Sequence, residues 1–391
     1  SLMNNLYSKN IINFKKNYNY HCFDWLTVSK KIGGGENINK SKNYLINWQK
    51  LKFKKYTFIW DSFFISKRLI NMIYNYDFYA VSSSNKEKGL FHLMILEHYY
   101  LLNFFIKINK NNNTSIEELK AILLVTLIYK KDHNYYLNIL KKIIKFQIDQ
   151  NGFHKSYNPT QQAYFLNNLY EIKNILLYFR IKVPEELNFK ILNMSSLLIS
   201  LIHNDSSIAL FHGANNNFIY KIFEILKQQG DLKLKDLSKI KNGIVNYTDK
   251  NKKIFMDIVS PINHPINNNF HASTLAFEFS CLGEKIITNC GSVNKMFEKN
   301  PEYLRYSAAH STITINNTNI SELIEKKSFK RIPENIYFNS SDNENVVVWN
   351  ASHDGYLKNY KKVVKRNIKI FKNQHIIEGQ DEIISTKINS K

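Results

Sequence analysis

The chain has 391 residues, 44% of them hydrophobic, which is enough to fill the cores of two or three ordinary domains. Its 54 Lys and Arg against 32 Asp and Glu give a formal net charge of +22. Such a charge attracts polyanions such as acidic polysaccharide or nucleic acid, but the Lys- and Asn-rich composition that an AT-rich genome encodes also accounts for it. No run approaches the ~18 uncharged apolar residues of a membrane-spanning helix, no leader of the secretory type is visible, and no nucleic-acid-binding motif accompanies the charge.

Residues from the start of the chain to about 230 are predicted to be helical. Short polar connections between the helical segments predict antiparallel helix pairs. Such repeated helix hairpins are typical of a bundle or of an (α/α) toroid, and periodicity does not choose between the two. Apolar residues recur at helical spacing in Asp61–Tyr76, Glu87–Ile108, Ser115–Tyr129, Asn134–Gln150, Thr160–Phe179 and Phe189–Ile202.

The pattern changes after Asp231–Lys241 to short runs with alternating apolar residues. These runs predict an antiparallel sheet domain of the sandwich type. We therefore divide the chain into a helical domain of residues 1–238 and a β-sandwich domain of residues 239–391. The predicted strands are Gly243–Tyr247, Lys253–Ser260, Thr312–Ile315, Val346–Ala351 and Val363–Phe371, together with the hairpin described next.

The most strongly patterned stretch is Asn268–Gly291. Its apolar residues Leu275, Phe277 and Phe279 alternate with small or polar residues, which predicts a strand with one buried face. A turn at Leu282–Glu284 and a second apolar run complete a β-hairpin.

Three histidines stand at the ends of predicted strands. His271 precedes the hairpin, His310 precedes Thr312–Ile315, and His353 closes the run from Val346. Histidines at strand ends can converge on one face of a sheet.

The cysteines are three in number, Cys22, Cys281 and Cys290, and they do not have the spacing of metal ligands. We interpret Cys281 and Cys290, on facing hairpin strands, as a pair of reduced core cysteines, with a disulfide between them as the alternative.

Several segments resemble one known family. HASTLAFEFS…TNCG, AAHSTITIN and ASHDGY, in this order and spacing, resemble the C-terminal sheet domain of the heparinase II/III-like polysaccharide lyases, in particular the branch found in alphaproteobacteria. The helical half follows the order of the same family in FDWL (Phe23–Leu26), WDSFFISKRLINMI (Trp60–Ile73), LEHYYLLN (Leu96–Asn103), NGFHKSYNP (Asn151–Pro159) and DSSIALFHG (Asp205–Gly213).

The resemblance covers most of the chain and implies a fold. It implies an N-terminal (α/α) toroid followed by a C-terminal antiparallel β-sandwich, with an active site in the cleft between them. Members of the family continue for further strands after the position of Ile376–Ser385, so the resemblance also implies that part of the sandwich is missing from this chain.

The resemblance further implies β-elimination on a uronic acid. Such a reaction needs a base for the C5 proton, an acid for the leaving oxygen, and a group that neutralises the sugar carboxylate. Tyrosine and histidine usually handle the protons, and no metal or cofactor is required. The loop NGFHKSYNP supplies His154, Tyr157 and Asn158, although Asn-Gly and Asn-Pro are also ordinary turn formers. Because lyases of this class use a tyrosine near this place, we expect Tyr157 to act as base or acid, with His154 as the next candidate.

The resemblance makes His271 the third catalytic candidate, with a hydrogen-bonded strand-end histidine as the alternative. Relatives that hold a structural zinc have a second histidine and an aspartate in this hairpin. Here Asn269 or Ser273, and Asn289, stand at those places, so we expect no zinc and no cofactor. The substrate-binding candidates are Asn158, Asn103, His310, His353, Arg305 and Tyr356, and for Asn103 a local hydrogen bond is the alternative.

The favoured hypothesis is a polysaccharide lyase-like enzyme whose partner is an acidic, uronic-acid-containing polysaccharide or oligosaccharide. The alternative is a non-catalytic glycan-binding or envelope polysaccharide-assembly protein on the same fold. Nucleic-acid binding rests on charge alone and is not favoured.

Overall fold

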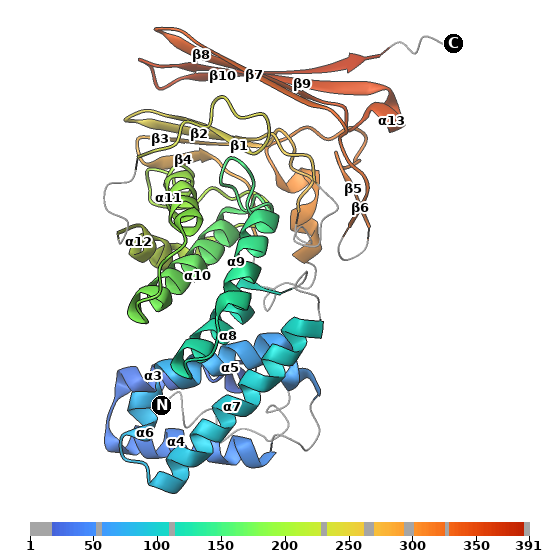
Figure 1. Cartoon of the computed structure of the whole chain (residues 1–391). Helices are drawn as coiled ribbons and strands as arrows, with labels where there is room; N and C mark the ends of the chain where they lie inside the picture. Colours follow the sequence, from blue (N-terminus) through green and yellow to red (C-terminus); the bar gives the residue numbers. More distant parts are fainter. Residues whose placement is uncertain are drawn as a thin grey trace. The chain divides into compact units, whose positions relative to one another are not determined.

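The computed structural model describes residues 18–51, 57–108, 114–227, 233–261, 270–292, 301–324 and 328–386. The chain forms two compact units, of which the first contains residues 1–145 and 174–181 and the second contains residues 146–173 and 182–391. Helices come first in the sequence and antiparallel sheets follow, as predicted (Figure 1). The last long helix ends at Lys227 and the first strand begins at Ile244, so the change of pattern in the sequence marks a real change of secondary structure.

All six helices predicted from periodicity are present, with ends that differ by a few residues. The largest difference is at the start of α11, because Pro184 caps a helix that begins at Glu185 with two acidic residues in its first turn. The helices are α2 Tyr18–Cys22, α3 Trp25–Ile32, α4 Gly35–Leu51, α5 Ser62–Tyr74, α6 Tyr76–Ala80, α7 Asn85–Ile108, α8 Ile116–Ile128, α9 Asn134–Gln147, α10 Pro159–Tyr178, α11 Glu185–Ile199, α12 Ile219–Lys227 and α13 Leu357–Tyr360. The short 3₁₀ helices are η2 Thr57–Trp60, η3 Asn216–Phe218, η5 Pro301–Arg305 and η6 Ser307–Ala309.

The first unit is built around α5, which packs on α7 and α8 and carries the fully buried Arg68. The guanidinium of Arg68 donates to His98 Nε2 at 2.7 Å and lies over the ring of Trp48 at 4.7 Å. It also donates to the carbonyl oxygens of His21 and Ile59. Burial lowers the pKa of Arg68 to about 9. Aromatic faces and carbonyl oxygens therefore surround this cation.

Helix α7 is the one helix of the described part that is long and apolar enough to cross a membrane by length and composition alone. A buried core helix passes the same test, and Met94, His98 and Leu102 on α7 are fully buried. The finding therefore does not show a membrane span.

The second unit contains two four-stranded antiparallel sheets and a short two-stranded ribbon. We call the sheet with the order β1-β2-β3-β4 the inner sheet and the sheet with the order β10-β9-β8-β7 the outer sheet. The strands are β1 Ile244–Thr248, β2 Lys252–Asp257, β3 Phe277–Cys281, β4 Glu284–Ile287, β5 Glu322–Ile324, β6 Ser328–Arg331, β7 Ile336–Asp342, β8 Val346–His353, β9 Lys362–Phe371 and β10 Ile377–Ser385.

The two sheets share one apolar cluster. Ile254, Met256 and Phe279 of the inner sheet meet Trp349 and Ile368 of the outer sheet in this cluster. A second cluster lies on the other side of the inner sheet and joins it to α11. The two sheets lie as layers, with α11 beside the inner one (Figure 1).

The predicted hairpin is present as β3 and β4, joined through Leu282 and Gly283 in left-handed conformations. The expectation that its first strand has only one buried face is wrong. Glu278 and Ser280 are fully buried as well, because His203 lies on their side of the strand. His203 Nε2 is 2.8 Å from a Glu278 carboxylate oxygen, and its Nδ1 is 2.8 Å from the Ser280 hydroxyl. A buried hydrogen-bonding partner thus replaces solvent on the polar face.

The expectation of a strand at Thr312–Ile315 is also wrong. This segment forms only an isolated bridge between Ile315 and Thr318, and the chain turns back at Asn316 and Asn317, which both have positive φ. The carbonyl oxygen of Ile313 accepts from the Tyr356 hydroxyl at 2.9 Å instead of from a neighbouring strand.

All three cysteines are free; Cys22 and Cys281 are buried, but Cys290 is exposed, so the expectation that Cys290 lies in the core is wrong.

Candidate functional site

The loop that carries His271 is fixed to the end of β2 by Asp257. This fully buried carboxylate accepts from the Ser273 hydroxyl at 2.7 Å and from the Val259 backbone N–H at 2.9 Å. The backbone groups of Asp257 also bond Leu275 and Ala276 across the loop. The conformation of the loop that carries His271 is therefore fixed by the Asp257 carboxylate, which lies outside the hairpin.

His212 approaches the same loop from a tight turn and has a positive φ of 49°. Its ring lies on the Phe270 ring with 4.3 Å between centroids, and its Nδ1 is 3.5 Å from the His271 backbone nitrogen and from the Ser273 hydroxyl. His212 Nε2 is 3.3 Å from an Asp257 carboxylate oxygen but makes no hydrogen bond of good geometry. An unusual backbone conformation is thus maintained beside buried polar groups, as at many functional sites.

His271 and His310 form the centre of the cluster, with 3.1 Å between His271 Nδ1 and His310 Nε2. Burial holds the pKa of His271 well below its ordinary value, and the neighbouring His310 and His212 act in the same direction. Burial also lowers the pKa of His310 to about 4. Both rings are therefore neutral near pH 7, and one of them donates the proton that the other accepts.

Arg305 brings positive charge to this cluster. Its Nε donates to the carbonyl oxygen of Phe270 at 3.0 Å, while its buried Nη2 has no hydrogen-bond partner among the described residues. His310 Nδ1 and His212 Nε2 are likewise buried without a hydrogen bond. These three buried nitrogen atoms lie in one cluster and are candidates for contact with a bound molecule.

Tyr157 reaches the cluster through Phe270, with 6.2 Å between the two ring centroids. Its hydroxyl donates to an Asp149 carboxylate oxygen at 3.2 Å and accepts from the Asn242 amide at 2.8 Å. Burial and the adjacent Asp149 raise the pKa of Tyr157 above its ordinary value. The phenol of Tyr157 therefore stays protonated near pH 7.

Asn158 links the Tyr157 loop to His212. Its side-chain oxygen accepts from the first backbone N–H groups of α10, and its amide donates to the His212 carbonyl oxygen at 2.8 Å. This geometry is that of an N-cap, which explains why Asn precedes Pro159 here. His154 is held apart by Ser156, at 2.7 Å from its Nδ1, and by the Phe165 ring.

The remaining candidates lie elsewhere. His353 Nδ1 accepts from the Gly355 N–H at 3.1 Å, and the Tyr356 hydroxyl donates to backbone carbonyl oxygens of the segment after His310. Asn103 on α7 accepts from the Tyr136 hydroxyl at 2.7 Å, which is a local hydrogen bond within the first unit. Two of the three strand-end histidines, His271 and His310, thus come together, and the roles of all these residues stay predictions.

Sequence reasoning did not single out His212, Asp257 or Asp149. His212 lies inside DSSIALFHG, a segment that carries only the family resemblance, and Asp257 lies inside the predicted strand Lys253–Ser260 although it ends the observed strand β2. No local pattern therefore marked either residue.

The described residues include no group of three or more His, Cys, Asp or Glu that could hold a metal ion. Asn289, which stands at one of the zinc-ligand positions implied by the resemblance, already has hydrogen-bond partners: its amide donates to Glu278 at 3.3 Å and its side-chain oxygen accepts from the Ser311 N–H. The residues present therefore do not fit the zinc of some relatives.

Comparison with known proteins supports the resemblance. Residues 235–388 match the family model described as heparinase II/III-like, C-terminal. The structure is similar to the heparan sulfate lyase HepC from Pedobacter heparinus, with a TM-score of 0.64 and 15% identity over 94% of this chain and 62% of that one. It is also similar to a protein named heparinase III, with a TM-score of 0.68 and 14% identity over 94% of this chain and 64% of that one. No curated protein is matched by sequence.

These findings support the predicted family: residues 235–388 match its C-terminal domain, and the fold is similar to that of the two solved structures. The arrangement of a helical N-terminal region before antiparallel sheets matches the fold of the two lyases. The chain spans about 62% of the length of the first of them, and the alphaproteobacterial branch stays a prediction.

Proposed function

We propose that this heparinase II/III-like chain belongs to a polysaccharide lyase that cleaves an acidic, uronic-acid-containing glycan by β-elimination. The base removes the C5 proton, the C4–O bond breaks, a C4=C5 double bond forms, and the leaving oxygen receives a proton. The heparan sulfate lyase HepC supports this class of substrate by its similar fold, at 15% identity. We also propose that the helical region is part of an (α/α) toroid and that the two sheets form the sandwich of the family.

One observation carries the proposal. The cluster of His212, His271, His310 and Arg305 contains the neutral imidazoles of His271 and His310 and the buried Arg305 Nη2 without a hydrogen bond, and the protonated Tyr157 contacts Phe270 of the same loop. A neutral imidazole is what a base requires, and a phenol that keeps its proton is what an acid requires.

We assign roles on this basis. His271 accepts the C5 proton, assisted by His310, which shares a hydrogen bond with it. Arg305 neutralises the sugar carboxylate through its unpartnered Nη2, so that the added negative charge of the transition state is tolerated. Tyr157 protonates the leaving oxygen, and Asp149 and Asn242 hold its hydroxyl in place. His154, Asn158, Asn103, His353 and Tyr356 keep the status of predicted site residues.

The test is incubation with heparan sulfate, heparin, alginate, hyaluronan and polygalacturonate while the ultraviolet absorbance of the new double bond is followed. We expect a rise with at least one polymer. His271→Ala and Tyr157→Phe should lower kcat by about 10²- to 10⁴-fold, which is the usual contribution of general acid–base catalysis. Tyr178→Phe is the matched control, because the Tyr178 side chain is 82% exposed. A rise that is equally fast in all variants would refute the assigned roles.

A second candidate function is a non-catalytic glycan-binding or envelope polysaccharide-assembly protein. It is favoured by the burial of His271 and His310, which are only 3% and 8% exposed. For this candidate the absorbance stays flat with every polymer, while binding of one polymer is still measured by calorimetry.

A further inference from the structure

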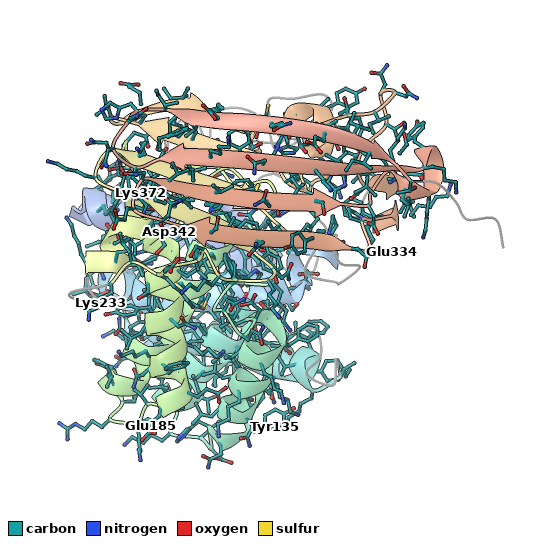
Figure 2. All side chains as sticks on the ribbon, turned by 90° about the horizontal axis from the view of Figure 1, so that it is seen from above. Tyr135, Glu185, Lys233, Glu334, Asp342 and Lys372 are labelled. Carbon is teal, nitrogen blue, oxygen red and sulfur yellow. The ribbon has the colours of Figure 1, made fainter. Side chains whose placement is uncertain are left out.

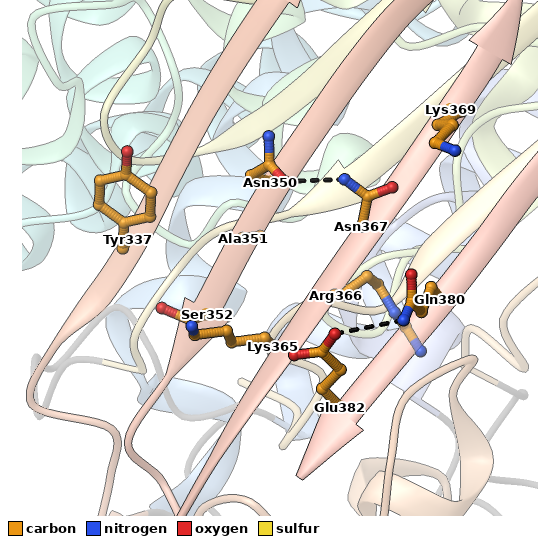
Figure 3. A pocket seen from close by; sticks show the side chains of 10 residues that line it. All are labelled: Tyr337, Asn350, Ala351, Ser352, Lys365, Arg366, Asn367, Lys369, Gln380 and Glu382. Atoms are coloured by element: carbon orange, nitrogen blue, oxygen red, sulfur yellow. Dashed lines mark hydrogen bonds between the residues drawn. The ribbon is translucent and has the colours of Figure 1, made fainter. Parts of the chain in front are cut away.

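The outer sheet has a groove on the face that points away from the apolar cluster. The groove has a volume of about 420 Å³, which lies within the usual range for small-ligand sites. It is formed by side chains of β7, β8, β9 and β10 (Figure 3). The whole sheet is seen in Figure 2, with the ion pair of Asp342 and Lys372 at one end and Glu334 at the other.

The strand register places the side chains of the groove in rows. Asn350, Asn367 and Gln380 are cross-strand neighbours and form a row of amides. Tyr337, Ser352, Lys365 and Glu382 form the next row. Since strand residues alternate, Trp349 and Ile368 point to the opposite face and fill the core.

The row of amides matches the hydrogen-bonding chemistry of a sugar chain. Asn367 donates to Asn350 at 2.7 Å, so each amide still has polar atoms for a ligand. Tyr337 stands beside this row with 58% of its surface exposed, and its flat ring offers a stacking surface. A partner helix is not suited to this face, because Tyr337 is the one large apolar side chain that lines it among the described residues.

Three cationic side chains, Lys365, Arg366 and Lys369, and one carboxylate, Glu382, line the groove. Lys365 lies directly opposite Glu382 in the register, yet Glu382 accepts from Gln380 at 3.2 Å and makes no ion pair with Lys365. Figure 3 shows Lys365 extending toward Ser352, away from Glu382. The nearby Arg366 is neutralised by two hydrogen bonds to Asp381 at 2.8 Å. Lys365 therefore has no ion pair among the described residues, and it lies in the same cross-strand row as Tyr337.

From these observations we propose that the groove is a second glycan-binding site, which holds a short acidic oligosaccharide with a carboxylate against Lys365. The sugar hydroxyls bond the amide row, and one sugar ring stacks on Tyr337. The site is separate from the histidine cluster, since its side chains lie on the outer face of the sheet. The site binds the glycan without taking part in the elimination, so this proposal does not depend on the proposed lyase activity.

The test uses heparosan tetrasaccharide as the acidic probe and chitotetraose as the neutral probe. Lysines of the full chain are acetylated with and without each probe, and the rate at Lys365 is measured by mass spectrometry. We expect heparosan tetrasaccharide to slow acetylation of Lys365 at least fivefold and chitotetraose to slow it less. Lys86, an exposed lysine on α7, is the internal control and should react at the same rate throughout.

Variants of the groove complete the test. Tyr337→Ser and Asn367→Ala should each raise the Kd for heparosan tetrasaccharide about 2- to 10-fold, which corresponds to the loss of one contact. Protection of Lys365 should persist in His271→Ala. Equal protection of Lys86 would show non-specific attraction to charge and overturn the proposal. Loss of protection in His271→Ala, or protection that grows with protein concentration in the absence of a probe, would overturn it too.

Discussion

Lys252 allows the packing of the two sheets to be tested in detail. Its ammonium group is almost completely buried and donates to the carbonyl oxygens of Phe371, Lys372 and Gln374, in the connection between β9 and β10. Asp249 lies 3.3 Å away and balances the charge. This one side chain thus joins the inner sheet to the outer sheet.

Replacing Lys252 by methionine keeps the apolar stem and removes the donors. Three buried carbonyl oxygens then lose their partner, and breaking a buried charged interaction of this kind costs about 3–5 kcal/mol. Since about 1.4 kcal/mol is a factor of ten, the local opening of this connection should become at least on the order of 100-fold more frequent.

Hydrogen exchange followed by mass spectrometry measures this opening. We expect faster exchange in residues 368–380 of Lys252→Met, where Phe371 and Gln374 donate backbone hydrogen bonds. Lys250→Met is the matched control, because Lys250 is exposed. If the two variants exchange within a factor of two of each other, the reasoning about the buried ammonium is refuted.

Three further predictions concern single residues. Gly291→Ala should lower the thermal midpoint of unfolding strongly, because the φ of Gly291 is 63° and an added Cβ would lie 2.6 Å from the Ala214 backbone oxygen. Gly283→Ala, with open space around the added Cβ, should lower it less. Equal shifts of the midpoint in the two variants would contradict this. Ser115→Ala removes the capping box of α8 and should cost about 1 kcal/mol in urea unfolding, so an unchanged midpoint would contradict the cap. Burial lowers the pKa of His353 to about 4, below the ~6.5 of an unfolded chain, so its contribution to stability is complete above pH ~6.5 and is lost as the pH falls toward 4. Between pH 7 and pH 4 the free energy of unfolding of His353→Gln should therefore fall by up to about 3 kcal/mol less than that of the wild type. Parallel falls in the two proteins would contradict the buried neutral ring.

Local chemistry explains which parts of the fold were predictable. The hairpin of β3 and β4 followed from alternation and a Gly-containing turn, which act over a few residues. Thr312–Ile315 has the same alternation, but its carbonyl groups find partners in side chains such as Tyr356, and no strand forms. Alternation alone does not report whether a neighbouring strand is present.

The site was predictable only in part, for a related reason. His271 and His310 stood out because each precedes a patterned run, and the structure brings them within hydrogen-bonding distance. His212 and Asp257 join them through contacts between residues far apart in the sequence, which no local pattern encodes. The buried pair of His203 and Glu278 was hidden in the same way, since Glu278 had the spacing of a solvent-exposed residue.

The central claim is that the cluster around His271 carries out β-elimination, and the products reveal this most directly. The protein is incubated with heparosan in water enriched in heavy oxygen, and the oligosaccharides are analysed by mass spectrometry. Elimination predicts unsaturated products that contain no heavy oxygen, and none of them in His271→Ala. Products that carry heavy oxygen, or unsaturated products formed equally by His271→Ala, would contradict the account.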